Sequence, residues 1–321
     1  MSVEAYRLYA AAQAHPGHAH PAALNFFATD AEINVVHPYN RQEGRESYRQ
    51  QVIFPPLEAF RGLYRRDHIV MSGAFDGSEW ISATGYYAGR FTAPWLGIPP
   101  TGELAYLRFG EFHRMEGREA VQSYVFLDIP EFMAACGCWP IAAGPGETRG
   151  FRGRIPGPAT QDGLAFPRDQ KRGVESAEMV TTMLRALNTP DEAWRPFWHD
   201  NMAWYGPGAF GSFLGVEAFR SFQVPFESQF EGWSGGAAGN GMTAHFTRFG
   251  DGDYVCSGGW PSLTGINVKP FLGQAASGER VFMRVCDWWR REGDLLVENW
   301  VFVDVPHVLL QLGRDVLGEL Q

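Results

Sequence analysis

Cysteine is scarce in this sequence, with four residues among 321, at positions 136, 138, 256 and 286. So few thiols suit a reducing compartment better than a disulfide framework, and we expect a cytoplasmic protein. Cys136 and Cys138 are separated by one residue, which is the wrong spacing for a zinc knuckle or a thioredoxin-type site.

Long apolar runs are also missing, and no stretch of eighteen apolar residues is present to span a membrane. The N-terminal segment lacks the basic start and apolar core of a signal peptide. Positive charge is in deficit, because 27 Lys and Arg face 36 Asp and Glu, for a net charge of -9. This balance repels phosphate backbones and anionic lipid, so we expect neither nucleic acid nor membrane as a partner.

Glycine and aromatic residues are plentiful, with 38 Gly and 14% Phe, Trp and Tyr. Such a blend suits curved sheets that turn often and line apolar cavities.

An internal repeat organises the chain. Residues 94–130 align without gaps on residues 270–306, and 14 of the 37 paired positions are identical. The repeat predicts two homologous units, 1–140 and 173–321, joined by a Gly- and Pro-rich linker over 141–172.

Each unit reads as helices first and a long antiparallel meander last, which predicts an α+β fold with helices covering one face of a curled sheet. In the second unit the opening helix is expected over 174–187, and Thr189 is a candidate cap for another helix. Gly117 and Gly293 are expected in hairpin turns at positions that require positive φ.

Two segments of the chain resemble the SnoaL-like polyketide cyclases of the nuclear transport factor two-like superfamily. The first is LGIPPTGELAYLRFGEFHRMEG with Asp128, and the second is its counterpart in the second unit, which ends in Asp304 and QLG. The resemblance covers both units. It implies two cone-shaped, curved antiparallel sheets with covering helices, packed as an intramolecular pseudo-dimer. It also implies cofactor-free aldol closure of a polyketide ester, with neither metal nor organic cofactor, in which an Asp at the place of Asp304 and Asp128 is the catalytic acid and base.

Asp304 follows a strand on which Trp300 and Phe302 share its face, so a pocket there would desolvate the carboxyl group and raise its pKa. Asp128 has Tyr124 and Phe126 in the same relation. The alternative is that Asp304 ends its strand, caps the next helix and faces water, and the retention of an Asp in both units also fits a structural cap.

Other polar residues are weaker candidates. His37, or Tyr205 in the second unit, is placed to hydrogen-bond a substrate carbonyl, although His37 also fits a plain turn residue before Pro38. His113 is a candidate second base. Glu111 and Arg108 lie three residues apart on one strand and cannot share a face, so we expect each to make a separate contact, and likewise for Asp287 and Arg284.

Aromatic residues are expected to line the pockets and to favour a small apolar or aromatic ligand. The candidates are Trp204, Tyr205, Phe222, Trp260, Phe271 and Trp300 in the second unit, and Tyr48, Tyr86, Trp95 and Tyr124 in the first. His15, His18 and His20 form a weak metal-binding candidate.

The leading hypothesis is therefore a polyketide cyclase-type enzyme that performs acid–base chemistry on a small apolar carbonyl compound. The alternatives are a non-catalytic binding or scaffolding protein of the same fold, or an isomerase, dehydratase or hydrolase. Further homo-oligomerisation beyond the pseudo-dimer is left open.

Overall fold

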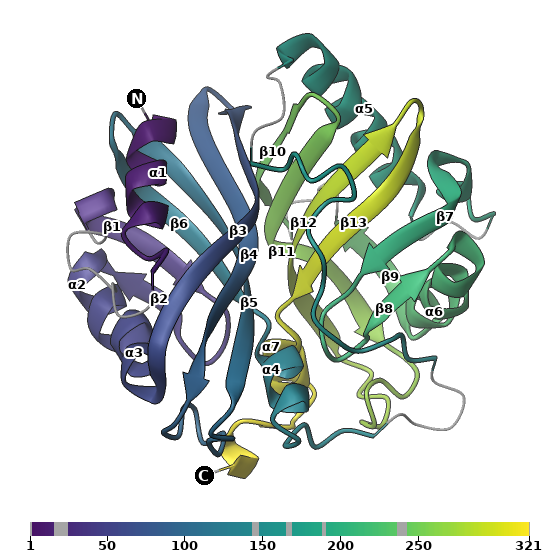
Figure 1. Ribbon diagram of the computed structural model, residues 1–321. Helices are drawn as coiled ribbons and strands as arrows, with labels where there is room; N and C mark the ends of the chain where they lie inside the picture. The colour runs from purple at the N-terminus through teal and green to yellow at the C-terminus, as the bar shows by residue number, and fades with distance from the viewer. Residues whose placement is uncertain are drawn as a thin grey trace. The chain divides into compact units, whose positions relative to one another are not determined.

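The computed structural model describes residues 2–15, 25–142, 148–164, 169–187, 191–235 and 243–320, and the chain divides into two units (Figure 1). Unit 1 comprises Met1–Trp139, Pro156–Ala165 and Leu317–Gln321, and unit 2 comprises Pro140–Ile155 and Phe166–Val316. The segment predicted as a linker, 141–172, is thus shared between the two units. Each unit is described by itself below.

Unit 1 contains one sheet of six strands in the order β2-β1-β6-β5-β4-β3. Its elements are α1 (Ser2–Ala11), β1 (Phe27–Val35), β2 (Asn40–Glu43), α2 (Gly44–Tyr48), a π-helical stretch (Arg49–Ile53), α3 (Phe54–Ala59), β3 (Phe60–Phe75), β4 (Ser78–Phe91), β5 (Leu104–Glu116), β6 (Glu119–Leu127) and α4 (Ile129–Ala135).

Unit 2 has a sheet in the corresponding order, β10-β11-β12-β13-β7-β8, with β9 paired to β11. Its elements are α5 (Gln170–Ala186), a 3-10 turn (Arg195–Phe197), β7 (Trp198–Tyr205), β8 (Ser212–Leu214), α6 (Val216–Ser228), β9 (Phe230–Gly235), β10 (His245–Asp251), β11 (Tyr254–Asn267), β12 (Arg280–Glu292), β13 (Leu295–Val303) and α7 (Val305–Gln311).

The α+β expectation is confirmed, but the sheets are mixed rather than purely antiparallel. β1 pairs with β6 in parallel, and β7 pairs with β13 in parallel. Between each such pair the chain passes through helices and an antiparallel meander, which returns the last strand beside the first in the same direction. Residues aligned in the sequence repeat occupy equivalent strands, β5 with β12 and β6 with β13.

Glycines allow the turns and close approaches of these bent sheets. Gly117 and Gly293 have φ of 64° and 57° in their hairpins, as predicted. Gly85 on β4 lies opposite Asp67 beside a bulge in β3, and a Cβ at Gly85 would lie 2.0 Å from the Arg66 carbonyl oxygen. Only glycine fits there.

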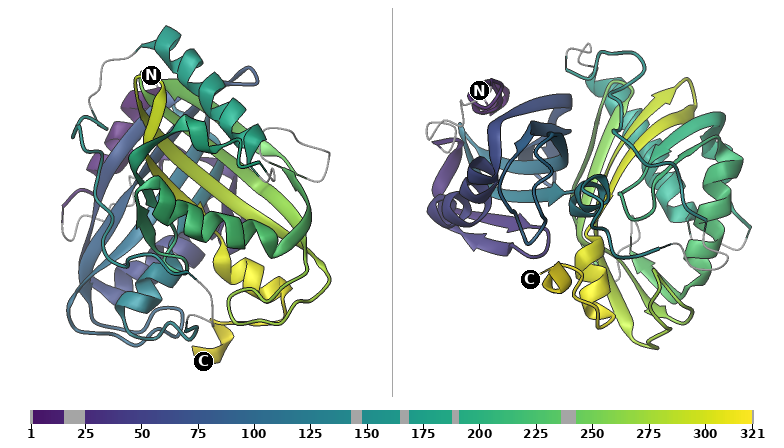
Figure 2. Two further views of the ribbon diagram at one scale, coloured as in Figure 1. Left: turned by 90° about the vertical axis from the view of Figure 1, so that its right-hand side faces the viewer. Right: turned by 60° about the horizontal axis from the view of Figure 1, so that its bottom comes forward.

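Helix α5 begins at Gln170, four residues before the predicted start, because the Asp169 side chain accepts a hydrogen bond from the Arg172 amide and caps it. Thr189 lies outside the described residues. In each unit, helices pack on one face of the bent sheet (Figure 2). This helix-covered face carries Glu111 and His113 in unit 1, where both contact Tyr6 of α1. In unit 2 it carries Trp204, whose ring contacts Phe222 of α6.

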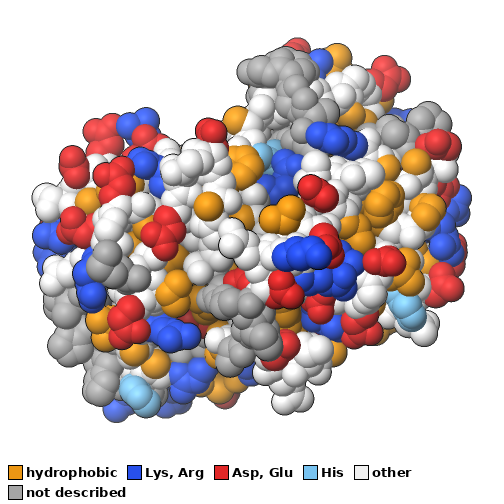
Figure 3. All heavy atoms as spheres, turned by 90° about the horizontal axis from the view of Figure 1, so that it is seen from above, with side chains coloured by type: hydrophobic (Ala, Val, Ile, Leu, Met, Phe, Trp, Pro, Cys, Tyr) orange, Lys and Arg blue, Asp and Glu red, His pale blue; other side chains and the backbone are white. Residues whose placement is uncertain are grey.

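None of the helices described here is both long and apolar enough to cross a bilayer. On the surface shown in Figure 3, Lys and Arg side chains are interspersed with Asp and Glu side chains rather than grouped by sign.

Candidate active site

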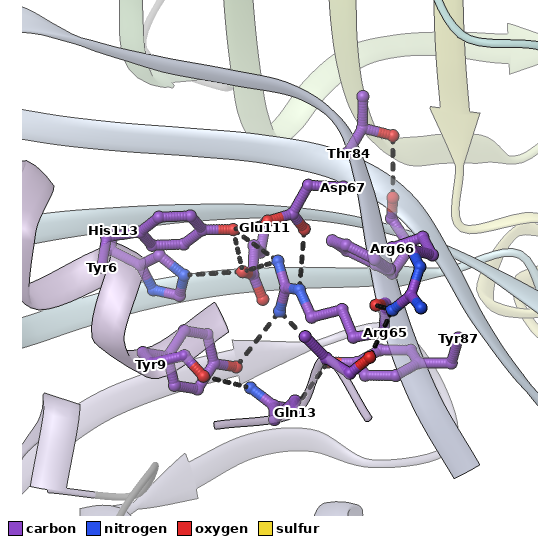
Figure 4. A network of polar contacts seen from close by, with 12 residues as sticks. Tyr6, Tyr9, Gln13, Arg65, Arg66, Asp67, Thr84, Tyr87, Glu111 and His113 are labelled. Atoms are coloured by element: carbon purple, nitrogen blue, oxygen red, sulfur yellow. Dashed lines mark hydrogen bonds and ion pairs between the residues drawn. The ribbon is translucent and has the colours of Figure 1, made fainter. Parts of the chain in front are cut away.

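A buried polar network occupies the helix-covered face of unit 1, and Arg65 of β3 is its centre (Figure 4). The guanidinium binds two carboxylates at once. Nη2 lies 2.5 Å from Glu111 Oε1 on β5, and Nε lies 2.8 Å from Asp67 Oδ1, two residues along β3. The Arg65 and Glu111 side chains are 1% exposed, whereas Asp67 is 11% exposed. Asp67 is therefore the carboxylate of this pair with access to solvent.

Two tyrosines of α1 close the network from the helix side. The Tyr6 hydroxyl lies 3.1 Å from Glu111 Oε1 and 3.5 Å from Asp67 Oδ2, and it accepts from Arg65 Nη2 at 2.5 Å. The Tyr9 hydroxyl lies 3.5 Å from Arg65 Nη1. Because Tyr6 and Tyr9 are three residues apart in one helix, both reach the same side of the network.

His113 extends the network along β5. Its Nδ1 lies 2.9 Å from Ser123 Oγ on the neighbouring strand, in the register that pairs the two residues. Its Nε2 lies 3.4 Å from Glu111 Oε1, at ion-pair distance but without hydrogen-bond geometry. The imidazole is fully buried among aromatic rings, and the Phe26 ring lies 4.9 Å away.

The two carboxyl groups that share Arg65 have pKa values displaced in opposite directions. Burial by itself raises the pKa of each. At Glu111 the charge and hydrogen bond of Arg65, together with the neighbouring His113, outweigh burial and lower the pKa to about 2. At Asp67 burial outweighs the attraction of Arg65, the Glu111 charge adds to burial, and the pKa is raised. One guanidinium does not neutralise two buried carboxylates, so Glu111 keeps its charge and Asp67 is biased toward its protonated form.

Unit 2 has different residues at the matching positions. In strand register, Asp287 corresponds to Glu111, Trp289 to His113 and Asn299 to Ser123. Asn299 Nδ2 lies 3.4 Å from Asp287 Oδ1 and donates to the Trp288 carbonyl at 3.0 Å. The imidazole and hydroxyl of unit 1 are thus replaced by an indole and an amide.

His245 of β10 forms a separate polar cluster on the helix-covered face of unit 2. Its Nδ1 lies 2.7 Å from Ser257 Oγ, and its Nε2 lies 3.0 Å from Ser262 Oγ. Burial, followed by the charge of Arg248, lowers the pKa of His245 to about 3. The imidazole is therefore neutral at physiological pH.

Asp304 and Asp128 are helix caps with arginine partners. Asp304 accepts a hydrogen bond from the His307 amide at the start of α7 and lies 3.0 Å from Arg284 Nη1. Asp128 accepts from the Glu131 amide at the start of α4 and lies 3.4 Å from Arg108 Nη1. The capping alternative is confirmed for both, except that both carboxylates are buried rather than facing water. Their catalytic role stays a prediction, which these contacts do not favour because the oxygens already have structural partners.

The contacts of Arg108 and Glu111 agree with the prediction that they act separately, because Arg108 binds Asp128 and Glu111 binds Arg65. Tyr124 pairs in register with Phe112, so it lies on the sheet face opposite Glu111.

The predicted aromatic residues of unit 2 divide between the two faces of its sheet. Trp204 lies on the helix-covered face, and Phe271 lines a cavity near α6 together with Phe222. Trp300 pairs in register with Trp288, on the face opposite Asp287, and its ring lies 5.4 Å from Tyr205. The Tyr205 hydroxyl bonds to Glu298 at 3.3 Å, and the Trp260 ring lies under the Arg284 guanidinium at 4.4 Å.

His37 lies half-buried in the turn between β1 and β2, directly before Pro38, as its structural alternative predicts. A contact between His37 and a substrate remains a prediction. His18 and His20 lie outside the described residues. Over the ranges that the structure does describe, no group of three or more His, Cys, Asp and Glu side chains is arranged to hold a metal ion.

Sequence reasoning missed Arg65, Asp67, Tyr6 and Tyr9. Strand β3 was not expected, because its sequence, FRGLYRRDHIVMSGAF, is interrupted by charges and has no clean alternation. The available signal was that charged run itself, since Arg and Asp two residues apart in a strand share a face and can pair.

No protein-family model matches the chain, and no curated protein matches it either. Solved structures do match. AclR from Streptomyces galilaeus, provisionally described as a hydroxylase, is 16% identical with a TM-score of 0.37 and covers 44% of this chain and 96% of its own. IdmH from Streptomyces antibioticus, provisionally described as a polyketide cyclase, is 16% identical with a TM-score of 0.36 over 43% of this chain and 99% of its own.

A third match, from Jannaschia sp. CCS1, is provisionally described as a SnoaL-like polyketide cyclase. It is 17% identical with a TM-score of 0.38 and covers 47% of this chain and 98% of its own. These descriptions include the cyclases that the sequence resembles, and each match covers less than half of this chain. None of these similarities assigns an activity to it.

Proposed function

We propose that the chain is an enzyme that carries out cofactor-free proton transfer, as in aldol closure or a related reaction, on a small apolar carbonyl compound. The proposed site is the network of unit 1, and Asp67 is the residue that takes and returns the proton. One observation carries the proposal: Glu111 and Asp67 share the guanidinium of Arg65, and their pKa values are displaced in opposite directions. Such a divided pair is the usual arrangement of acid–base sites.

The chemistry follows from the raised pKa of Asp67. A carboxyl group whose pKa is closer to neutrality is a stronger base when ionised and remains able to return the proton. In the proposed step the Asp67 carboxylate removes a proton from the carbon next to a carbonyl. The electron pair of the broken C–H bond forms the enolate. The enolate either attacks a second carbonyl, whose oxygen then takes the proton from Asp67, or takes the proton back at carbon. Hydrogen-bond donors near Asp67, among them the Tyr6 hydroxyl, are suited to the enolate oxygen.

Unit 1 is preferred over unit 2 because the two units differ at the decisive positions. Trp289 and Asn299 stand in unit 2 where His113 and Ser123 stand in unit 1. Asp304 and Asp128 remain alternative bases, and the experiment below includes both.

The second candidate function is binding without turnover. It is favoured by the closed state of the network, in which Arg65 and Glu111 are 1% exposed beneath the tyrosines of α1. A substrate reaches Glu111 only if α1 moves, whereas the partly exposed Asp67 needs a smaller displacement.

Exchange of hydrogen for deuterium at carbon tests the proposal with simple model carbonyl compounds in place of the natural substrate. Aryl β-keto esters and aryl diketones are incubated with the protein in D₂O, and loss of the α-proton signal is followed by NMR. We expect the wild type to accelerate exchange for at least one compound, and Asp67→Asn to lower the enzymatic rate by about 100-fold or more. Asp76→Asn is the matched control, because Asp76 is exposed in the hairpin that ends β3, and its φ of 49° suits Asn.

Exchange that Asp67→Asn leaves intact but Asp304→Asn or Asp128→Asn removes would transfer the role to that cap residue. Binding of these compounds without accelerated exchange would favour the non-catalytic alternative.

A further inference from the structure

A cavity in unit 2 has the chemistry of a site for an anionic aromatic ligand. Its volume is about 480 Å³, within the range of small-molecule sites. It is formed where the C-terminal half of α6 meets the connection between β11 and β12. Its lining shares no residue with the polar network of unit 1 or with the cluster at His245.

The floor of the cavity consists of four phenylalanine rings, each in contact with two or more of the others. Phe222 and Phe226 are one helical turn apart on α6, with ring centroids 5.6 Å apart. Phe210 lies 5.2 Å from Phe222, and Phe271 lies 6.1 Å from Phe226 and from Phe210. Rings fixed by mutual contact lose little further freedom when a flat ligand packs on them.

The Phe271 ring is held by a tight turn. The Phe271 amide donates to the Gln274 carbonyl at 3.0 Å, and the Gln274 amide donates back to the Phe271 carbonyl at 2.9 Å. Leu272 and Gly273 between them have φ of 47° and 73°, the left-handed values that such a turn requires. This wall of the cavity is therefore preformed.

The charge of the lining is opposite to that of the chain. Asp and Glu outnumber Lys and Arg in the sequence by 36 to 27, yet the described residues that line the cavity include two basic ones, Arg149 and Lys269, and no acidic one. Arg149 is fixed beside the aromatic floor, because its Nη1 donates to the carbonyl of Ala209, next to Phe210, at 2.6 Å. Lys269 is exposed at the rim, two residues before Phe271. An apolar floor beneath two cations selects a flat ring system that carries a negative group.

We propose that this cavity binds an aromatic carboxylate, with the rings on the phenylalanine floor and the carboxylate between Lys269 and Arg149. The inference does not depend on proton transfer in unit 1, since a ligand held here needs no acid or base. It assigns a binding role to unit 2, in which Trp289 and Asn299 stand in place of His113 and Ser123 of the unit 1 network.

The lysine composition of the chain provides a matched pair of variants. The sequence has two lysines, Lys269 at the cavity and Lys171 exposed on α5 outside its lining. Lys269→Met and Lys171→Met remove the same charge from the same chain, so any difference between them reports on position.

The test is titration of the full chain with 2-naphthoate and with its uncharged analogue 2-naphthalenemethanol, by calorimetry at low salt. We expect naphthoate to bind more tightly than the alcohol, and Lys269→Met to weaken naphthoate about threefold to tenfold without affecting the alcohol. Lys171→Met should change neither, and 0.5 M salt should reduce the advantage of naphthoate, because rim charges are screened. Phe226→Ala should weaken both probes.

Absence of binding by either probe, equal affinity for the two probes, or equal losses in the two lysine variants would each overturn the proposal. The folded state of Phe226→Ala is checked by its circular dichroism, and the lysine pair gives the decision if that variant fails to fold. Because binding is measured directly, the result is separate from the exchange experiment on unit 1.

Discussion

Glu111 and Asp67 bind the same guanidinium, that of Arg65, at 2.5 and 2.8 Å, yet the pKa of Glu111 is lowered and that of Asp67 is raised. The difference follows from sharing one guanidinium between two carboxylates. Glu111 has Arg65, Tyr6 and His113 around it, whereas Asp67 shares Arg65 and faces the negative charge of Glu111. Glu111 therefore stays ionised and binds Arg65, whereas Asp67 is the carboxyl group that titrates.

Opposite effects on stability should follow from neutralising the two carboxylates. Glu111→Gln should lower the free energy of unfolding at pH 7 by about 3–5 kcal/mol, because it leaves the buried Arg65 short of a charged partner. Asp67→Asn should leave stability unchanged or higher. The pKa of Asp67 is higher in the folded protein than its unfolded value of about 3.8, so ionising Asp67 lowers the free energy of unfolding as pH rises between these two pKa values. Asn carries no charge and removes this loss. Urea unfolding at pH 7 measures both.

Equal losses in the two variants would mean that Arg65 depends on both carboxylates alike. The assignment of Asp67 as the titrating member would then be wrong. Asp76→Asn, in the exposed turn that follows the same strand, serves as the baseline.

The two capping aspartates should differ in how much stability they provide. Asn retains the ability to cap a helix, so Asp128→Asn and Asp304→Asn isolate the loss of charge. The Arg108 side chain is 1% exposed, whereas that of Arg284 is 15% exposed and lies over the Trp260 ring. We expect Asp128→Asn to cost about 3 kcal/mol and Asp304→Asn about half of that. A larger loss in Asp304→Asn by denaturant unfolding would contradict the ranking.

His245 should make unit 2 sensitive to acid. Its folded pKa of about 3 lies below the unfolded value of about 6.5, so the unfolded chain binds the proton first as pH falls. The stability that the neutral His245 provides is therefore complete above pH 6.5 and is lost as pH falls toward 3. The free energy of unfolding decreases by at most about 1.4 kcal/mol per pH unit in this range. His245→Gln should flatten this dependence in urea unfolding between pH 7 and 4. His199→Gln, at a partly exposed position on β7, should retain it, and identical slopes in the two variants would contradict the assignment.

Gly85 should not tolerate alanine. The added Cβ would lie 2.0 Å from the Arg66 carbonyl oxygen, so β3 would have to move between Arg65 and Asp67, beside the bulge that follows Asp67. We expect a loss of about 3 kcal/mol or more. Gly157→Ala, where the nearest atom would be 3.5 Å away, should change stability by less than about 0.5 kcal/mol. Thermal unfolding that ranks the two alike would contradict the close approach.

Much of the fold could be predicted from the sequence. The repeat identified equivalent strands, and the hairpin glycines Gly117 and Gly293 were expected with the correct sign of φ. These features depend on local patterns that a sequence displays directly. The parallel pairing of β1 with β6 was not predictable in this way, because it depends on where the chain returns after the strands and helices between them.

The candidate site was predicted only in part. His113 was a candidate and lies in the network. Tyr124 and Trp300 were also candidates, but they lie on the other face of their sheets. Period-two alternation shows which residues share a face, but it does not indicate which face the helices cover. Arg65 and Asp67 come from a strand broken by charge, and their partner Glu111 is 46 residues from Arg65 in the chain. Such a juxtaposition requires the folded sheet.

The most direct test of proton transfer at Asp67 is the rate of α-carbon hydrogen–deuterium exchange in an aryl β-keto ester, measured for wild type, Asp67→Asn and Asp76→Asn. We predict exchange accelerated by wild type and by Asp76→Asn, and a loss of about 100-fold or more in Asp67→Asn with its fold intact. Wild-type acceleration that persists unchanged in Asp67→Asn would contradict the central claim.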